Sequence, residues 1–205
     1  MNKTTLKELT KDRLNDWWNN GKIKDKHGVV RNTKEYVPRL FGLALNRYLS
    51  DLEYHKTQPD WFVQSYRNDN HRNTCLENQI YRLIIGYNGI GGVLTPGITN
   101  LYSEEALKCN DNSLLTDDHI IGVTEVGRIV RNIIDSLLEQ GLTNDEIINY
   151  MSYEWLPENL YLWVKAKITR KEHKKNNLPR NKHTLEEKVN LVHYNIGKIK
   201  LVIKG

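Results

Sequence analysis

The chain has few of the residues that mark disulfide-rich, zinc-binding or membrane-spanning proteins. Its two cysteines, Cys75 and Cys109, form no CxxC pair, which excludes a zinc knuckle and a disulfide framework. No apolar run approaches the roughly 20 residues that a membrane span requires. The N-terminus has a lysine but no apolar segment, and so gives no secretory signal. We therefore expect an intracellular protein with no membrane partner.

Its size and composition indicate a globular protein with a real core. At 205 residues, with 39% hydrophobic and 27% charged residues, the chain can form one large domain or one domain with an appendage. The net charge of +5 is distributed unevenly, because residues 165–205 hold 12 Lys and Arg against three Glu. An asymmetry of this kind favours a polyanionic partner, of which nucleic acid is the commonest. A solvated basic face without a partner is the alternative.

The first hundred residues are predicted to be mainly helical. Apolar residues at spacings of three and four predict one helix from Leu6 to Trp18, after a cap at Thr4 or Thr5, and a second from Val37 to Leu52. A third is predicted over 75–85. The glycine-rich stretch that follows, 86–92, lacks the GK[ST] ending of a phosphate loop and is interpreted as a flexible connector.

The second half mixes strands and helices. The run 114–121 is β-prone and apolar, yet carries Asp117, Asp118 and His119 side by side. A strong amphipathic helix is predicted over 124–140, and a shorter one follows the capping box that starts at Thr143. Further along, the pattern predicts strands over 160–168 and 196–203, with helices after the capping boxes that begin at Thr169 and Thr184.

The Asp-Asp-His run is the most informative feature of the sequence. Buried strands rarely carry such residues for packing, because burying an unpaired charge is costly. A carboxylate beside an imidazole at a strand end is suited to metal-assisted hydrolysis, in which one group holds a divalent cation and the other takes a proton from water. The alternative is an ordinary polar strand end whose imidazole is hydrogen-bonded to a neighbour.

Three short motifs then occur in order along the chain: Asp118-His119-Ile120, Asn159-Leu160, and Thr169-x-x-Glu172-His173. They resemble the motif of the HNH, or His-Me finger, endonucleases, often written DHI, NL and T-x-x-EH. In that family two strands and a helix surround one divalent metal. The resemblance covers roughly residues 113–178 and does not extend to the first hundred.

The resemblance implies a role for each matching residue. His119 would be the general base, since a histidine with an ordinary pKa of about 6.5 is largely neutral at physiological pH. Asp118 and His173 would bind the metal, most plausibly Mg²⁺, and Asn159 would brace the loop that positions His119. Asn177, four residues after His173, would share its helix face, and either Asn177 or the adjacent Asn176 could replace or supplement His173 as a ligand.

Basic residues surround this helix and could contact phosphates that flank the scissile one. The predicted nucleic-acid-binding residues are Lys165, Lys167, Arg170, Lys171, Lys174, Lys175, Arg180 and Lys182.

The spacing of the motif departs from compact members of the family. His119 and Asn159 are 40 residues apart, so a helical pair over 124–151 would have to be inserted between the two strands. Surface insertions of this size carry little entropic cost. The predicted fold is therefore α+β and mostly helical, with a helical region over 1–100. A ββα-metal region with an inserted helical pair and a basic end would occupy 101–205.

The sequence is also compatible with functions other than a nuclease. A non-catalytic helix-turn-helix DNA-binding protein would use the helices joined through Gly141, although Asn144, Asp145, Asn149 and Tyr150 bring little positive charge to the major groove. A phage structural or assembly protein with a basic tail is a further possible function. Asn159 could be a turn residue and His173 a solvent-facing one. The favoured reading is a homing or phage-type DNA endonuclease, for which a homodimer would allow both strands to be cut.

Overall fold

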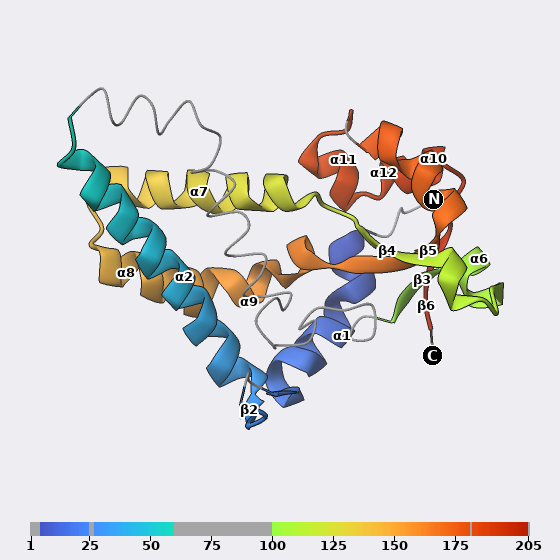
Figure 1. The fold of residues 1–205 in the computed structure, drawn as a ribbon, viewed down its shortest axis with the longest axis horizontal. Coiled ribbons are helices and arrows are strands. Elements are labelled where there is room, and N and C mark those ends of the chain that lie inside the picture. Colours follow the sequence, from blue (N-terminus) through green and yellow to red (C-terminus); the bar gives the residue numbers. More distant parts are fainter. Residues whose placement is uncertain (1–4, 25–26, 60–99, 181, 205) are drawn as a thin grey trace. The chain divides into compact units, whose positions relative to one another are not determined.

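The computed structural model describes residues 5–24, 27–59, 100–180 and 182–204. Helices make up most of this part of the chain and the strands form two small sheets, which confirms the prediction of a mostly helical α+β fold (Figure 1). The predicted helix at 75–85 and the glycine-rich segment 86–92 lie outside the described residues, as does Cys75. None of the helices in the described ranges has the length and apolarity that a membrane span requires.

The chain divides into two compact units, each made of separate stretches of sequence. The first contains residues 1–17, 94–122 and 160–205, and the second contains 18–93 and 123–159. These units differ from the predicted division at residue 100. The reason is that the chain leaves the first unit after one strand, forms helices in the second unit, and returns to the first unit for the next strand.

The second unit is built from helices and one short hairpin. The long helix α2 packs against α8 and the π-helical turn that follows it. Thr143 and Glu146 form the predicted capping box at the start of α8. Gly141, after the end of α7, has a φ of 84°, a conformation that favours glycine. The elements of this unit are β1 (Lys22–Lys24), β2 (Val30–Asn32), α2 (Thr33–Lys56), α7 (Val123–Glu139), α8 (Asn144–Asn149), the π-helical segment Tyr150–Trp155 and α9 (Leu156–Asn159).

The first unit contains a four-stranded sheet with the strand order β4-β5-β3-β6. The strands β4 and β5 are antiparallel, β5 and β3 are parallel, and β3 and β6 are antiparallel. In the register of β4 on β5, Asp117 is opposite Lys167, Asp118 is opposite Ala166, and His119 is opposite Lys165. The strands are β3 (Leu101–Ser103), β4 (Leu115–His119), β5 (Lys165–Thr169) and β6 (Leu201–Ile203).

Helix α10 (Arg170–Arg180) follows β5 directly and packs against both β4 and β5. Its start is fixed by the predicted capping box, in which Thr169 Oγ1 accepts from the Glu172 amide and the Glu172 carboxylate accepts from the Thr169 amide. Helix α12 packs against α10. The remaining helices of this unit are α6 (Glu104–Lys108), α11 (Leu185–Val189), α12 (Val192–Ile196) and the N-terminal part of α1 (Leu6–Asn20).

Two predicted strands are shorter than the sequence indicates. Residues Leu160–Trp163 form a 3₁₀-helix and the strand begins only at Lys165, because a short continuous apolar run is compatible with either structure. The strand predicted over 196–203 is reduced to β6. The helix predicted after Thr184 is broken at Leu191, which has a φ of 55°.

Candidate metal centre

The carboxylate of Asp118 is buried and is held by side chains from two other elements. Its side chain is 1% exposed, although β4 is an edge strand of the four-stranded sheet. Tyr194, from α12, donates its hydroxyl to Oδ2 over 2.6 Å. Asn176, from α10, donates its side-chain amide to the same oxygen over 3.0 Å. These two hydrogen bonds offset much of the cost of burying the carboxylate.

The second oxygen of Asp118 faces His173. The Nε2 atom of His173 lies 3.5 Å from Asp118 Oδ1, and the His173 side chain is 32% exposed. The capping box places His173 in the first turn of α10, directly after Glu172, and the packing of α10 on β4 brings its ring to Asp118. The arrangement therefore has a buried oxygen on one side and a histidine open to solvent on the other.

Asn176 supplies a further oxygen next to this pair. It is three residues after His173, so the two side chains share one face of α10. Its side chain is 1% exposed, and its Oδ1 has no hydrogen-bond partner among the described residues. A buried acceptor without a partner is unusual and indicates a place for a water molecule or a cation. The side chain of Asn177, the predicted ligand, lies outside the described part of the structure.

These donors fit a divalent cation with oxygen and nitrogen ligands. Ligand bonds of about 2.1 Å allow two donor atoms 3.5 Å apart to bind one ion. Across the described ranges no group of three or more His, Cys, Asp and Glu side chains is arranged to hold a metal. The protein would thus supply Asp118 and His173, with Asn176 beside them. Mg²⁺ suits such a site because it commonly keeps several waters and binds only one or two carboxylates.

His119 is the last residue of β4 and lies opposite Lys165 in the register. Side chains alternate between the two faces of a strand, so His119 shares a face with Asp117 and Lys165 rather than with Asp118. The ion pair between Asp117 and Lys167, 2.9 Å long, marks this same face. The structure therefore places Asp118 and His119 on opposite faces at the end of the strand.

Lys165 and Lys167 differ in their surroundings from the other predicted nucleic-acid-binding residues. Burial lowers the pKa of Lys165, and the negative charge of Asp117 offsets part of this effect. Lys167 is engaged by Asp117. By contrast, the lysines and the arginine at the start of α10 and beyond its end are exposed; they are Arg170, Lys171, Lys174, Lys175 and Lys182. The side chain of Arg180 lies outside the described residues.

Asn159 occupies a helix and not a loop between strands. It is the last residue of α9, and its side-chain amide donates to the Trp155 carbonyl over 2.8 Å. It belongs to the second compact unit, whereas His119 belongs to the first. The predicted loop conformation of Asn159 is therefore wrong, because the chain before β5 continues as helix through Trp163.

Of the two residues that hold the Asp118 carboxylate, Asn176 is a possible ligand in the sequence analysis and Tyr194 is not among the predicted site residues. Asn176 carries a signal in the sequence, since it follows His173 by three residues on a predicted helix. Tyr194 carries none, because it comes from a separate helix whose packing on α10 no local pattern indicates.

Comparisons with protein-family models, with curated proteins and with solved structures find no match for this chain.

Proposed function

We propose that the protein is a metal-dependent endonuclease of the His-Me finger type that hydrolyses DNA phosphodiester bonds. One observation carries the proposal: the antiparallel strands β4 and β5 and the helix α10 bring Asp118 and His173 to within 3.5 Å. These two residues come from opposite ends of the motif on which the resemblance rests. Their proximity in a strand–strand–helix arrangement supports a shared ligand role that the sequence alone could only suggest.

In this proposal Asp118 Oδ1 and His173 Nε2 hold the cation, and Asn176 and Tyr194 orient the carboxylate. Residues that orient a metal ligand commonly matter for metal affinity nearly as much as the ligand. The bound cation would supply Lewis-acid stabilisation of the charge that develops on the phosphate and on the leaving oxygen. His119 would accept a proton from the attacking water, a role that depends on its place after Asp118 in the motif. Because the register puts it on the opposite face from Asp118, its ring would have to reach the water around the end of β4.

The basic residues of the same unit are suited to hold the nucleic acid. Exposed cations lie on α10 itself, on the same helix as His173. Cations that contact phosphates position a nucleic acid without reading its sequence. The site and the cations would therefore act on one substrate, a polynucleotide held by its backbone.

The helix-turn-helix alternative receives no support from charge. Residues 144–159, which form α8, the π-helical turn and α9, contain four acidic residues and no lysine or arginine. A helix with this composition would be repelled by the phosphates that border the major groove. The helix α8 and the helical segments that follow it are therefore not proposed as the DNA-reading element.

The proposal is tested with supercoiled plasmid DNA and the full chain, with Mg²⁺ or with EDTA. We expect nicking with Mg²⁺ only, and its loss in His119→Ala while DNA binding, followed by fluorescence anisotropy, is retained. His27→Ala removes a histidine near the hairpin of the second unit and serves as the matched control that should cut normally. Binding without cleavage in the presence of Mg²⁺, Mn²⁺ or Ca²⁺ would rule out the nuclease.

A further inference from the structure

A second feature of the first unit is a cavity of about 560 Å³ that contains none of the candidate metal ligands. Its volume is within the range of about 300–1,000 Å³ that is usual for ligand sites. The walls come from α6, the first turns of α10 and the segment Gly197–Ile199 that follows α12. Five of the lining side chains are cations, namely Lys108, Arg170, Lys171, Lys175 and Lys198, and two are acids, Glu105 and Glu172.

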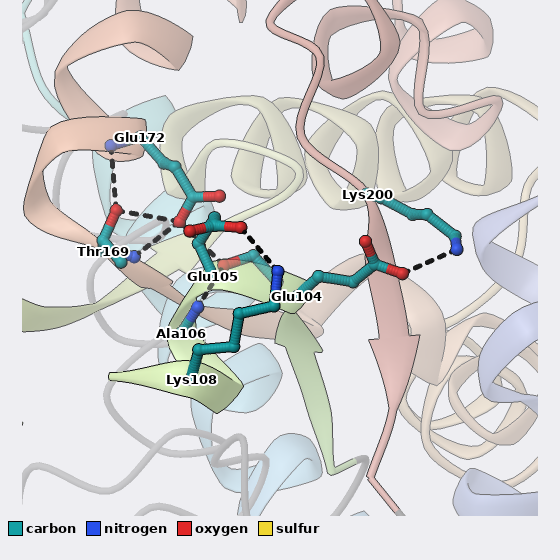
Figure 2. Close-up of polar contacts among 8 residues, drawn as sticks. Glu104, Glu105, Ala106, Lys108, Thr169, Glu172 and Lys200 are labelled. Carbon is teal, nitrogen blue, oxygen red and sulfur yellow. Dashed lines mark hydrogen bonds and ion pairs between the residues drawn. The ribbon is translucent and has the colours of Figure 1, made fainter. Parts of the chain in front are cut away.

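The cavity carries an excess of positive charge, because its five lining cations outnumber its two acids, and both acids are held by neighbouring groups. Glu105 accepts from Lys108 over 2.9 Å. The Glu172 carboxylate accepts from the Thr169 amide and from the Ser103 hydroxyl, and its side chain turns back toward Thr169 (Figure 2). Glu104 is not one of the lining residues, and it accepts from Lys200 over 2.6 Å (Figure 2). The donors to Glu172 are uncharged, so its carboxylate keeps its negative charge, and five cations against two acids give the lining a net charge of +3.

Four of the lining cations form no ion pair with the described residues: Arg170, Lys171, Lys175 and Lys198. Arg170 and Lys171 are the first two residues of α10, where the amide groups of a helix have no partner within the helix and attract anions. Several like charges that converge on one concavity repel one another unless an anion joins them. The cavity is thus arranged to receive a group with more than one negative oxygen.

The backbone of Lys198 has an unusual conformation for a lysine. Its φ is 53°, in the left-handed region where glycine or asparagine is the usual residue after a helix. A long cationic side chain at this position is exposed and lines the cavity. A lysine here is not explained by the backbone conformation, and a phosphate in the cavity would give it a role.

We propose that this cavity binds a backbone phosphate of the nucleic acid, separate from the phosphate at the candidate metal centre. The inference depends on the proposed function only in taking the polyanion to be the nucleic acid. It selects Lys171, Lys175 and Lys198 from among the basic residues, and it gives Lys198, which the motif does not include, a direct contact with the substrate.

The experiment measures binding of a fluorescent DNA duplex by the full chain in EDTA, over a series of salt concentrations. Lys198→Asn removes the charge with a residue that tolerates positive φ, and Lys175→Gln removes one from the facing wall. Each variant should weaken binding several-fold and lower the slope of log K against log salt by about 0.9. The matched control is Lys34→Gln on helix α2 of the second unit, which is exposed, does not line the cavity and belongs to no proposed binding surface.

The control should change affinity by less than about twofold, because an exposed charge outside the contact acts only through screened long-range attraction. Equal effects of Lys34→Gln and Lys175→Gln would overturn the cavity site, as would an unchanged slope in Lys198→Asn with a normal circular dichroism spectrum. Binding in EDTA that depends on Lys175 and Lys198, without cleavage in Mg²⁺, would leave the cavity site standing and remove the nuclease. Cleavage in Mg²⁺ by a protein whose DNA binding does not depend on Lys175 and Lys198 would support the nuclease and remove the cavity site.

Discussion

The hydroxyl of Tyr194 lies 2.6 Å from Oδ2 of Asp118 and connects α12 to the strand that carries the candidate metal ligand. Tyr194 is 1% exposed, so water does not compete for this hydrogen bond. With Asn176 on the same oxygen, the carboxylate is fixed with its other oxygen toward His173. The chain beyond α10 therefore takes part in the site, although the motif in the sequence ends before it.

Removal of the Tyr194 hydroxyl tests this connection. Tyr194→Phe keeps the buried ring and leaves Oδ2 of Asp118 with one donor fewer. We expect the free energy of unfolding in urea to fall by about 1.5–3 kcal/mol, the usual contribution of a hydrogen bond to a charged group. If Asp118 binds a cation, Mn²⁺ affinity measured by calorimetry should fall by about 10–100-fold, as for other residues that orient a ligand.

A matched variant separates this effect from the general loss of a tyrosine hydroxyl. Tyr102→Phe lies in β3 of the same unit, where Lys204 Nζ lies 5.7 Å from the centre of the ring, a contact that the variant keeps. It should leave stability within about 0.5 kcal/mol of the parent, as most substitutions away from buried polar groups do. Equal losses in the two variants would contradict a specific role for Tyr194.

Asp118→Asn distinguishes a metal ligand from a merely structural carboxylate. The amide oxygen can still accept from Tyr194 and Asn176, so the fold should lose only about 1 kcal/mol as charged hydrogen bonds become neutral ones. The charge that a divalent cation needs is removed, however, and cation binding should be lost. His173→Ala should weaken Mn²⁺ binding without a large loss of stability, because that side chain is partly exposed. Unchanged calorimetric titrations in both variants would show that the pair is structural.

Much of this unit follows from local rules that the sequence displays. The capping boxes at Thr143, Thr169 and Thr184 all form, because the pattern specifies two hydrogen bonds within four residues. The pairing of β4 with a strand before α10 was also predicted, across an insertion of helices. Local sequence patterns are therefore sufficient to predict the strand that carries Asp118 and the helix that carries His173.

Other parts depend on contacts that no local pattern contains. The strand β3 was not predicted, because its three residues pair with β5 and β6, which are distant in sequence. The contribution of Tyr194 has the same origin. The residues before β5 form a 3₁₀-helix because the α-helical chain of the second unit runs on into them, and an apolar run such as Leu160–Trp163 has no periodicity that excludes this.

The capping boxes predict how stability depends on acid. Hydrogen bonds from the backbone amide and side chain of Thr143 lower the pKa of Glu146 below its ordinary value of 4.5. A carboxylate whose pKa is lowered on folding stabilises the fold above the pKa of the unfolded chain and loses this contribution as pH falls through the folded pKa. Unfolding in urea should therefore become easier below about pH 4.5. Glu146→Gln should flatten that dependence between pH 5 and 3, and an identical pH profile for the variant would contradict it.

Gly42 is placed in the middle of α2, where a side chain would press against the neighbouring helix. A Cβ atom at this position would lie 3.2 Å from Ile148 Cγ2 and 3.3 Å from Ser152 Oγ, both in the second unit. Gly42→Ala gains about 1 kcal/mol in helix propensity and loses a similar amount to this close contact, so we expect little net change. Gly42→Leu cannot be accommodated in the same way and should lower the free energy of unfolding by about 1–3 kcal/mol or more. Leu43→Ala, at the exposed neighbouring position, is the control that should lie near the parent. A Gly42→Leu variant as stable as the parent would show that α2 does not pack closely against Ile148 and Ser152 in solution.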